Sequence, residues 1–162
     1  MSKILIVYYS LSGVTKQVVD LLAHEIDATV IPIEEPSKRS GFFGYMRSGF
    51  EALTRGEPEV RTRMHEPARF PVTVLASPVW AGKMCSPMRS YIASRKGEFR
   101  DIALLATMGG SGGRSTIADM ADAAGKEPVT TLFLRERQVR ARAVADDVTE
   151  FARKIEAVIA AG

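Results

Sequence analysis

A loop rich in hydroxyl groups, Ser10-Leu-Ser-Gly-Val-Thr15, lies between an apolar run and a helical pattern. The first N–H groups of a helix have no partner within the helix, and together with the helix dipole they attract an anion. Hydroxyls would add donors, and Gly13 would let the backbone come close. The loop is therefore predicted to bind a phosphate group. The alternative is a serine-rich turn with a capping residue.

Two common phosphate-binding motifs are absent from the sequence. It contains no GxxxxGK[ST] pattern, and the glycines at 109, 110, 112 and 113 fail the GxGxxG fingerprint because position 115 is serine. A nucleoside triphosphate and a dinucleotide held in that manner are both disfavoured. A monophosphate fits the loop better.

Two further segments could contact a flat ligand. The segment SPVWAGKMCSP contains the only tryptophan, Trp80, which could stack on a ring, or could instead fold over the edge of the core. The small residues Ala81 and Gly82 would let peptide groups reach the ring edge. The glycine-rich segment 107–113 could line the ligand with backbone donors, or could be a flexible connector. Phosphate binding, stacking and backbone recognition together favour flavin mononucleotide (FMN).

Apolar runs and helical patterns would position these loops. The run KILIVYY is almost continuously apolar, as expected of a strand buried on both faces of a parallel sheet. The expected strands are 3–9, 28–33, 72–77, 102–108 and 129–134. The expected helices are 14–26, with Ser12 or Thr15 as its cap, then 86–94, 115–124 and 139–160, with a short helix at 45–53 inside the basic, aromatic segment 36–69.

This alternation predicts the α/β class, with a doubly wound five-stranded parallel sheet of order 2-1-3-4-5 and helices on both faces. Residues 1–162 would form a single domain. Ligands of such sheets bind at the carboxyl ends of the strands, beside the point where the strand order reverses. Segments 10–15, 78–86 and 107–114 are therefore expected to meet at one edge.

Composition and charge exclude several classes of protein. Of 162 residues, 46% are hydrophobic and 25% charged, which is typical of a globular domain. No apolar run is long enough to span a membrane, no signal peptide is visible, and one cysteine cannot form an internal disulfide, so a cytoplasmic location is expected. Between Lys38 and Arg114, 13 Lys and Arg oppose 6 Asp and Glu. These cations are scattered and form no nucleic-acid-binding motif.

The motif YYSLSGVT resembles the phosphate-binding signature of the flavodoxins, and the element order over essentially the whole chain is similar to the flavodoxin-like superfamily, with an unbroken fifth strand as in the short-chain form. The resemblance implies FMN as the cofactor and the flavodoxin-like fold. It implies phosphate contacts from Ser10, Leu11, Ser12, Gly13, Val14 and Thr15, and ring contacts from Pro78, Val79, Trp80, Ala81, Gly82, Thr107, Met108, Gly109, Gly110 and Gly113.

Two features differ from the electron-shuttling flavodoxins. Those proteins are acidic, whereas this chain is cationic around the expected site, and the segment TMGGSGG lacks the tyrosine that commonly covers the ring. An open ring face suits a second substrate, and PVWAGKMCSPMRSYI is similar to quinone and FMN reductases. The alternatives to an electron carrier with a redox partner protein are therefore an NAD(P)H-dependent quinone or flavin reductase and a flavin-free interaction module. No side chain is expected to act as an acid or base.

The remaining reactive side chains have simpler interpretations. Cys85 precedes a helix, but its nearest arginine, Arg89, is four positions away rather than the six of the low-molecular-weight phosphatases, so a packed thiol is expected. His24 and His65 each stand alone, and no metal site is predicted. The cluster Arg135, Arg137, Arg140 and Arg142 could bind a dinucleotide phosphate or an acidic partner, or could be a solvated face. The oligomeric state stays open.

Overall fold

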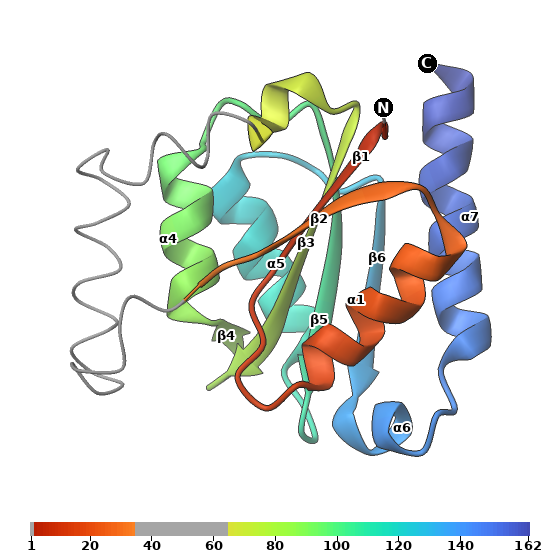
Figure 1. The fold of residues 1–162 in the computed structure, drawn as a ribbon. Coiled ribbons are helices and arrows are strands. Elements are labelled where there is room, and N and C mark those ends of the chain that lie inside the picture. Colours follow the sequence, from red (N-terminus) through yellow and green to blue (C-terminus); the bar gives the residue numbers. More distant parts are fainter. Residues whose placement is uncertain (1, 35–64) are drawn as a thin grey trace.

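The computed structural model describes residues 2–34 and 65–162. They form a layered structure in which one sheet lies between two layers of helices (Figure 1). The helix expected at 45–53 and most of the basic segment 36–69 lie outside the described residues. None of the described helices is long and apolar enough to cross a membrane.

Five parallel strands make up the main sheet, in the order β2-β1-β3-β5-β6. Taken in chain order these five are the predicted order 2-1-3-4-5, so the predicted topology is confirmed. β1 is buried along its whole length, as its continuous apolar run predicted. The strands are β1 (Ile4–Tyr8), β2 (Ala28–Pro32), β3 (Val72–Trp80), β5 (Asp101–Met108) and β6 (Thr130–Arg135).

A short sixth strand, β4 (Lys83–Met84), was not expected from the sequence. β3 continues three residues past its predicted end and pairs antiparallel with β4, Val79 with Met84 and Trp80 with Lys83. The connecting residues Ala81 and Gly82 have φ values of 51° and 76°. A two-residue hairpin turn with both φ values positive matches the right-handed twist of its strands. The segment after position 77, expected to be a loop, is therefore a hairpin.

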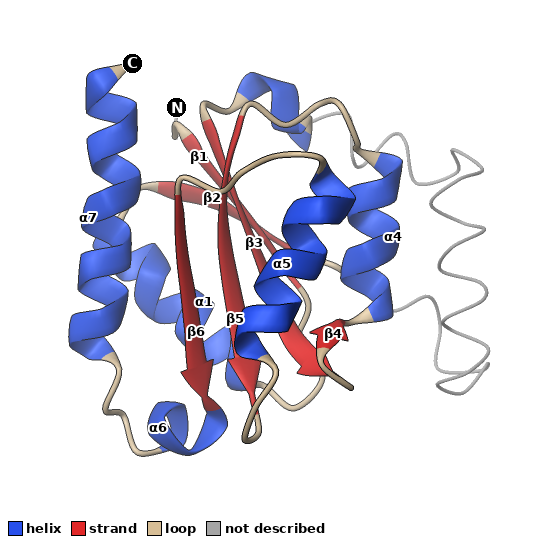
Figure 2. Cartoon of the chain, turned by 180° about the vertical axis from the view of Figure 1, so that it is seen from behind, coloured by secondary structure: helices blue, strands red, loops and turns tan. Residues whose placement is uncertain are grey.

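Helices cover both faces of the sheet, as predicted (Figures 1 and 2). On one face α1 (Val14–Glu25) and α7 (Ala145–Ala161) pack on a core that includes Ile4, Ile6 and Tyr8. On the other face α4 (Ser86–Ser94) and α5 (Gly113–Ala124) pack on a core that includes Leu5 and Val7. Alternate side chains of β1 therefore pack into two cores on opposite faces of the sheet.

The prediction of one long final helix at 139–160 was wrong. The structure has a short helix, α6 (Glu136–Arg140), then a turn containing Arg142 with φ of 55°, and then α7. Val139 and Val144 are both buried, with 0% and 1% exposure. Five residues of continuous helix would turn the second side chain roughly 140° away from the first. A break between them lets both valines face the same core.

Candidate functional site

The three predicted ligand-binding segments meet at the carboxyl edge of the sheet, where the strand order reverses between β1 and β3 (Figure 1). Two contacts join them directly. Thr15 Oγ1 lies 2.8 Å from Thr107 Oγ1, which connects the first segment to the third. An ideal Cβ on Gly112 would lie 3.1 Å from Gly82 Cα, so the third segment also touches the hairpin turn. One edge therefore carries all three.

The first loop is held by Ser10, and not by Ser12 or Thr15 as expected. Ser10 Oγ accepts hydrogen bonds from the N–H groups of Gly13, at 3.1 Å, and Lys16, at 3.2 Å. Gly13 is the residue that precedes the helix and makes no side-chain cap. Within the described part of the chain, no hydrogen bond uses the N–H groups of Val14 and Thr15. These donors at the start of α1 suit an anion.

Side chains of this loop divide between the surface and the interior. Leu11, Ser12 and Gly13 are exposed, Leu11 by 60%. Thr15 is buried, and its hydroxyl forms a hydrogen bond with the hydroxyl of Thr107, which is also buried. At the surface the loop therefore presents one exposed hydroxyl, Ser12, beside backbone donors.

The hairpin carries Trp80 at the end of β3. The Trp80 ring meets Tyr9, the residue after β1, edge to face, with ring centroids 5.7 Å apart and an interplanar angle of 89°. Trp80 is partly exposed and packs against the core on the α4 and α5 side. The indole therefore covers the edge of the core, as one of the two interpretations has it, and part of it stays exposed. Stacking of Trp80 on a ligand ring stays a prediction.

Two α5 side chains that the sequence analysis did not single out contact this hairpin. Ser115 Oγ donates to Gly82 O at 2.6 Å and also lies 3.0 Å from Gly112 O. Asp119 Oδ2 accepts the N–H of Met84 at 3.1 Å and pairs with Arg89. Their partners in the hairpin are backbone atoms more than thirty positions away in the chain. Side-chain patterns carry no signal for such contacts.

The third segment combines open and packed glycines. Gly109 and Gly110 are exposed, and an added Cβ at either would meet nothing within 4 Å. Arg135 Nε donates to Gly110 O at 3.3 Å. Gly113 instead packs under Phe133, where a Cβ would lie 2.8 Å from the ring. Pro78 and Val79 belong to β3. Met108 is buried and is the last residue of β5, directly before Gly109 and Gly110 in the chain.

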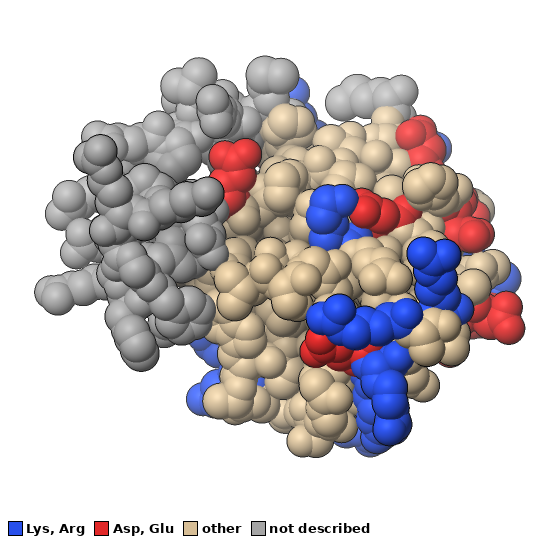
Figure 3. Space-filling view, turned by 60° about the horizontal axis from the view of Figure 1, so that its bottom comes forward, with Lys and Arg blue, Asp and Glu red and all other residues tan. Residues whose placement is uncertain are grey.

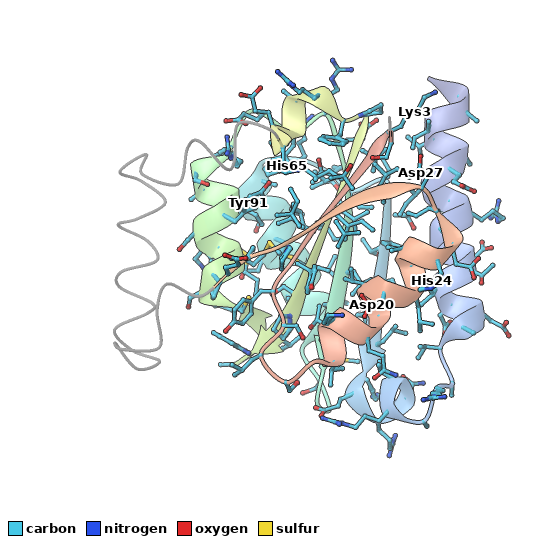
Figure 4. All side chains as sticks on the ribbon, viewed as in Figure 1. Lys3, Asp20, His24, Asp27, His65 and Tyr91 are labelled. Atoms are coloured by element: carbon cyan, nitrogen blue, oxygen red, sulfur yellow. The ribbon has the colours of Figure 1, made fainter. Side chains whose placement is uncertain are left out.

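The buried thiol is the packed residue that the sequence predicted. Cys85 is fully buried, and its N–H donates to Ser77 Oγ at 3.0 Å. Burial raises the pKa of the Cys85 thiol from its ordinary 9.0 to about 11, so the thiol stays protonated at neutral pH. The two histidines lie on different elements, His24 in α1 and His65 before the 3-10 turn Pro67–Arg69 (Figure 4). Among the described residues, no group of three metal-ligating side chains comes together.

Basic side chains gather on part of the surface at the carboxyl edge of the sheet (Figure 3). Lys16 pairs with Asp20 at 2.7 Å, and Arg140 pairs with Glu136 at 2.6 Å. Three more arginines are exposed and form no ion pair with any described residue: Arg135, Arg137 and Arg142. Glu136, between Arg135 and Arg137 in the chain, is the acidic partner of Arg140, and Asp146 and Asp147 follow in the first turn of α7. The arginine cluster is therefore solvated and only partly neutralised.

Solved structures share this fold at low sequence identity. A flavoprotein in complex with FMN from Lactobacillus acidophilus is 19% identical, matches over 87% of this chain and 98% of its own, and has a TM-score of 0.57. A proposed flavoprotein from Bacteroides uniformis is 16% identical over 94% and 98% of the two chains, with a TM-score of 0.66. The rubredoxin oxygen:oxidoreductase from Desulfovibrio gigas is 15% identical over 99% of this chain but 37% of its own, with a TM-score of 0.61.

No protein-family model matches the sequence, and no curated protein matches it. The architecture and the solved structures nevertheless agree with each other. This chain has the flavodoxin-like fold, and the resemblance seen in YYSLSGVT and in the element order is confirmed at the level of the fold.

Proposed function

We propose that this chain is an FMN-binding redox protein that carries electrons through a non-covalently bound flavin. One observation carries the proposal: a helix start with unused N–H groups, a hairpin bearing Trp80 and an open glycine pair converge on one edge of the sheet. The helix start would suit the phosphate of FMN, Trp80 its ring, and the glycine pair the edge of the ring. The FMN bound to the Lactobacillus acidophilus flavoprotein of the same fold supports this choice of ligand.

The described residues fit FMN at both of its ends. The N–H groups of Val14 and Thr15, with the Ser12 hydroxyl, would hold the phosphate, and the open space around Gly13 leaves room for it. The hairpin turn and the pair Gly109 and Gly110 would face the ring. Bound FMN would supply one-electron and two-electron chemistry, while the protein binds and orients it.

No protein side chain is assigned to proton transfer in this proposal. Cys85 lies near the hairpin, but burial raises the pKa of its thiol to about 11, and Ser77 already occupies its N–H. Thr15 and Thr107 bond to each other beneath the loops. The role of the chain is therefore to hold the ligand and to order the backbone around it.

Titration of the purified protein with FMN tests the proposal. We expect a yellow complex whose flavin fluorescence is quenched, because Trp80 lies at the site edge. In Trp80→Ala the bound flavin should be brighter and weaker-binding, since an aromatic contact contributes roughly 0.5–1.5 kcal/mol beyond buried area. A protein that neither contains nor takes up FMN would reject the proposal and leave the flavin-free interaction module.

A second candidate is an NAD(P)H-dependent quinone or flavin reductase of the same fold. Arg135, Arg137 and Arg142 favour it, because these incompletely neutralised cations lie at the same edge as the proposed flavin and could attract the donor's phosphates. Such attraction weakens with salt, since screening limits its reach to about 8 Å at physiological ionic strength. NAD(P)H oxidation with a quinone acceptor should then fall as salt is added. Absence of turnover at every salt concentration would favour the electron carrier.

A further inference from the structure

Two side chains of α5 hold the hairpin at two separate points. Ser115 and Asp119 are four residues apart and so lie on the same face of the helix. Ser115 Oγ bonds the turn at Gly82 O, and Asp119 bonds the returning strand at the N–H of Met84. We propose that Ser115 and Asp119 form a clamp that positions Trp80 and the hairpin turn for the flavin ring, an inference that rests on the proposed function.

The hairpin needs support because it extends beyond the sheet. The pairing of β3 with β1 ends at Ala76, and its pairing with β5 ends at Pro78. Among the described strands, Val79 and Trp80 continue past both neighbours, and their strand pairing is with the two residues of β4. A two-stranded hairpin of this length has little stability of its own.

The turn itself adds to this need. Ala81 has a φ of 51°, in the left-handed region that residues with a Cβ adopt only at an energetic cost. The hydroxyl of Ser115 donates to the carbonyl of the next residue, Gly82, at 2.6 Å. A contact from α5 therefore helps to keep the turn in the observed conformation.

Asp119 also connects the hairpin to α4. Its carboxylate pairs with Arg89, so the group that accepts the Met84 N–H also has a cationic partner on α4. Behind the clamp, Gly112 leaves no gap between α5 and the turn, since a Cβ there would lie 2.9 Å from Val79 Cγ1. Helix and hairpin thus form one packed unit. A ligand that stacks on Trp80 would not have to order this unit on binding, which favours affinity.

The clamp can be tested in the absence of flavin because Trp80 is the only tryptophan. We expect Ser115→Ala and Asp119→Asn to make Trp80 emission in the flavin-free protein more accessible to acrylamide quenching. Asp122→Asn, one turn further along α5 and exposed, is the matched control and should leave quenching unchanged. Unchanged quenching in both clamp variants, with native circular dichroism, would overturn the inference.

Flavin affinity provides the second measurement. Each clamp variant should bind FMN about three- to tenfold more weakly, the effect of one hydrogen bond, and the loss should shrink in a Trp80→Ala background because the clamp acts through that residue. An equal loss in that background, or a loss without altered Trp80 quenching, would refute the clamp. A wild type that binds no FMN would refute the proposed function and the role of the clamp toward flavin, while the quenching data would still show whether α5 positions Trp80.

Discussion

The starts of α1 and α5 have almost the same backbone but opposite surroundings. Gly13 precedes α1 with φ 91° and ψ −5°, and Gly112 precedes α5 with φ 94° and ψ 2°. Around Gly13 an added Cβ would meet nothing within 4 Å, whereas at Gly112 it would lie 2.9 Å from Val79 and 3.1 Å from Gly82. One backbone arrangement thus leaves a helix start open to a ligand in one loop and packs a helix against a hairpin in the other.

The two loops are also ordered by different kinds of contact. In the first loop, Ser10 accepts N–H groups three and six residues further along the same loop and helix. The hairpin is held by Ser115 and Asp119, which come from a helix more than thirty residues later. Substitution of Ser10 should therefore have local effects, whereas substitution of Ser115 or Asp119 should have long-range effects at the hairpin.

The largest effect is expected for Gly112→Ala. Alanine there would combine a left-handed backbone with overlap onto the hairpin, and the free energy of unfolding should fall by roughly 2–4 kcal/mol. Gly13→Ala meets only the backbone penalty, of about 1–2 kcal/mol. Urea denaturation of the two variants measures the difference. Equal losses would mean that the packing of Gly112 on the hairpin contributes nothing to stability.

The next prediction concerns pH and the interior behind the hairpin. Burial raises the pKa of Cys85 from 9.0 to about 11, so between these values the unfolded chain loses the thiol proton and the folded chain keeps it. The contribution of this thiol to stability is thus complete below pH 9 and is lost as pH rises toward 11, by up to about 1.4 kcal/mol per pH unit. Unfolding of the wild type and Cys85→Ala from pH 7 to 11 should show a smaller decline in the variant. If the free energies of unfolding of the two proteins fell in parallel with pH, the raised pKa of Cys85 would be contradicted.

The same division between local and long-range contacts explains what the sequence could predict. Periodicity and continuous apolar runs predicted all five parallel strands, because burial on one or both faces leaves a pattern in consecutive residues such as Ile4 to Tyr8. The alternation of strands and helices predicted their order. The break after α6 was missed because no proline or glycine between Val139 and Val144 marks it, although Val139 is out of phase with the apolar stripe that begins at Val144.

The meeting of the three segments of the candidate site was predictable to the same extent. The three segments were found from their residue types, and the fold brings them to one edge. The hairpin was missed because Ala81 is an uncommon residue at positive φ, and β4 has only two residues. Ser10 was not recognised as the residue that holds the first loop, because the sequence offers Ser12 and Thr15 as equally good helix caps. Only the structure shows that Thr15 is buried and that Ser10 accepts the backbone N–H of Gly13.

The exposed hydroxyl of the open loop gives the third prediction. Ser12→Ala should weaken FMN binding about tenfold or more, because a hydrogen bond to a charged group contributes roughly 1.5–3 kcal/mol. Riboflavin, which lacks the phosphate, should bind the variant as it binds the wild type. Calorimetry with both ligands measures the two affinities. An equal loss for both would show that the loop does not contact phosphate.

The smallest effect is expected for Ser10→Ala, and it tests the comparison most directly. Ser10 bonds only within its own loop and the first turn of α1, so its loss should lower the free energy of unfolding by about 1 kcal/mol, as for other helix caps. Loosening of the N–H groups of Val14 and Thr15 should weaken FMN binding about fivefold while acrylamide quenching of Trp80 stays at its wild-type value. Ser115→Ala should do the reverse, changing the quenching of Trp80 while leaving the start of α1 intact. If Ser10→Ala altered Trp80 quenching as much as Ser115→Ala does, the two loops would be one mechanical unit, and the distinction between a locally ordered loop and a clamped hairpin would be wrong.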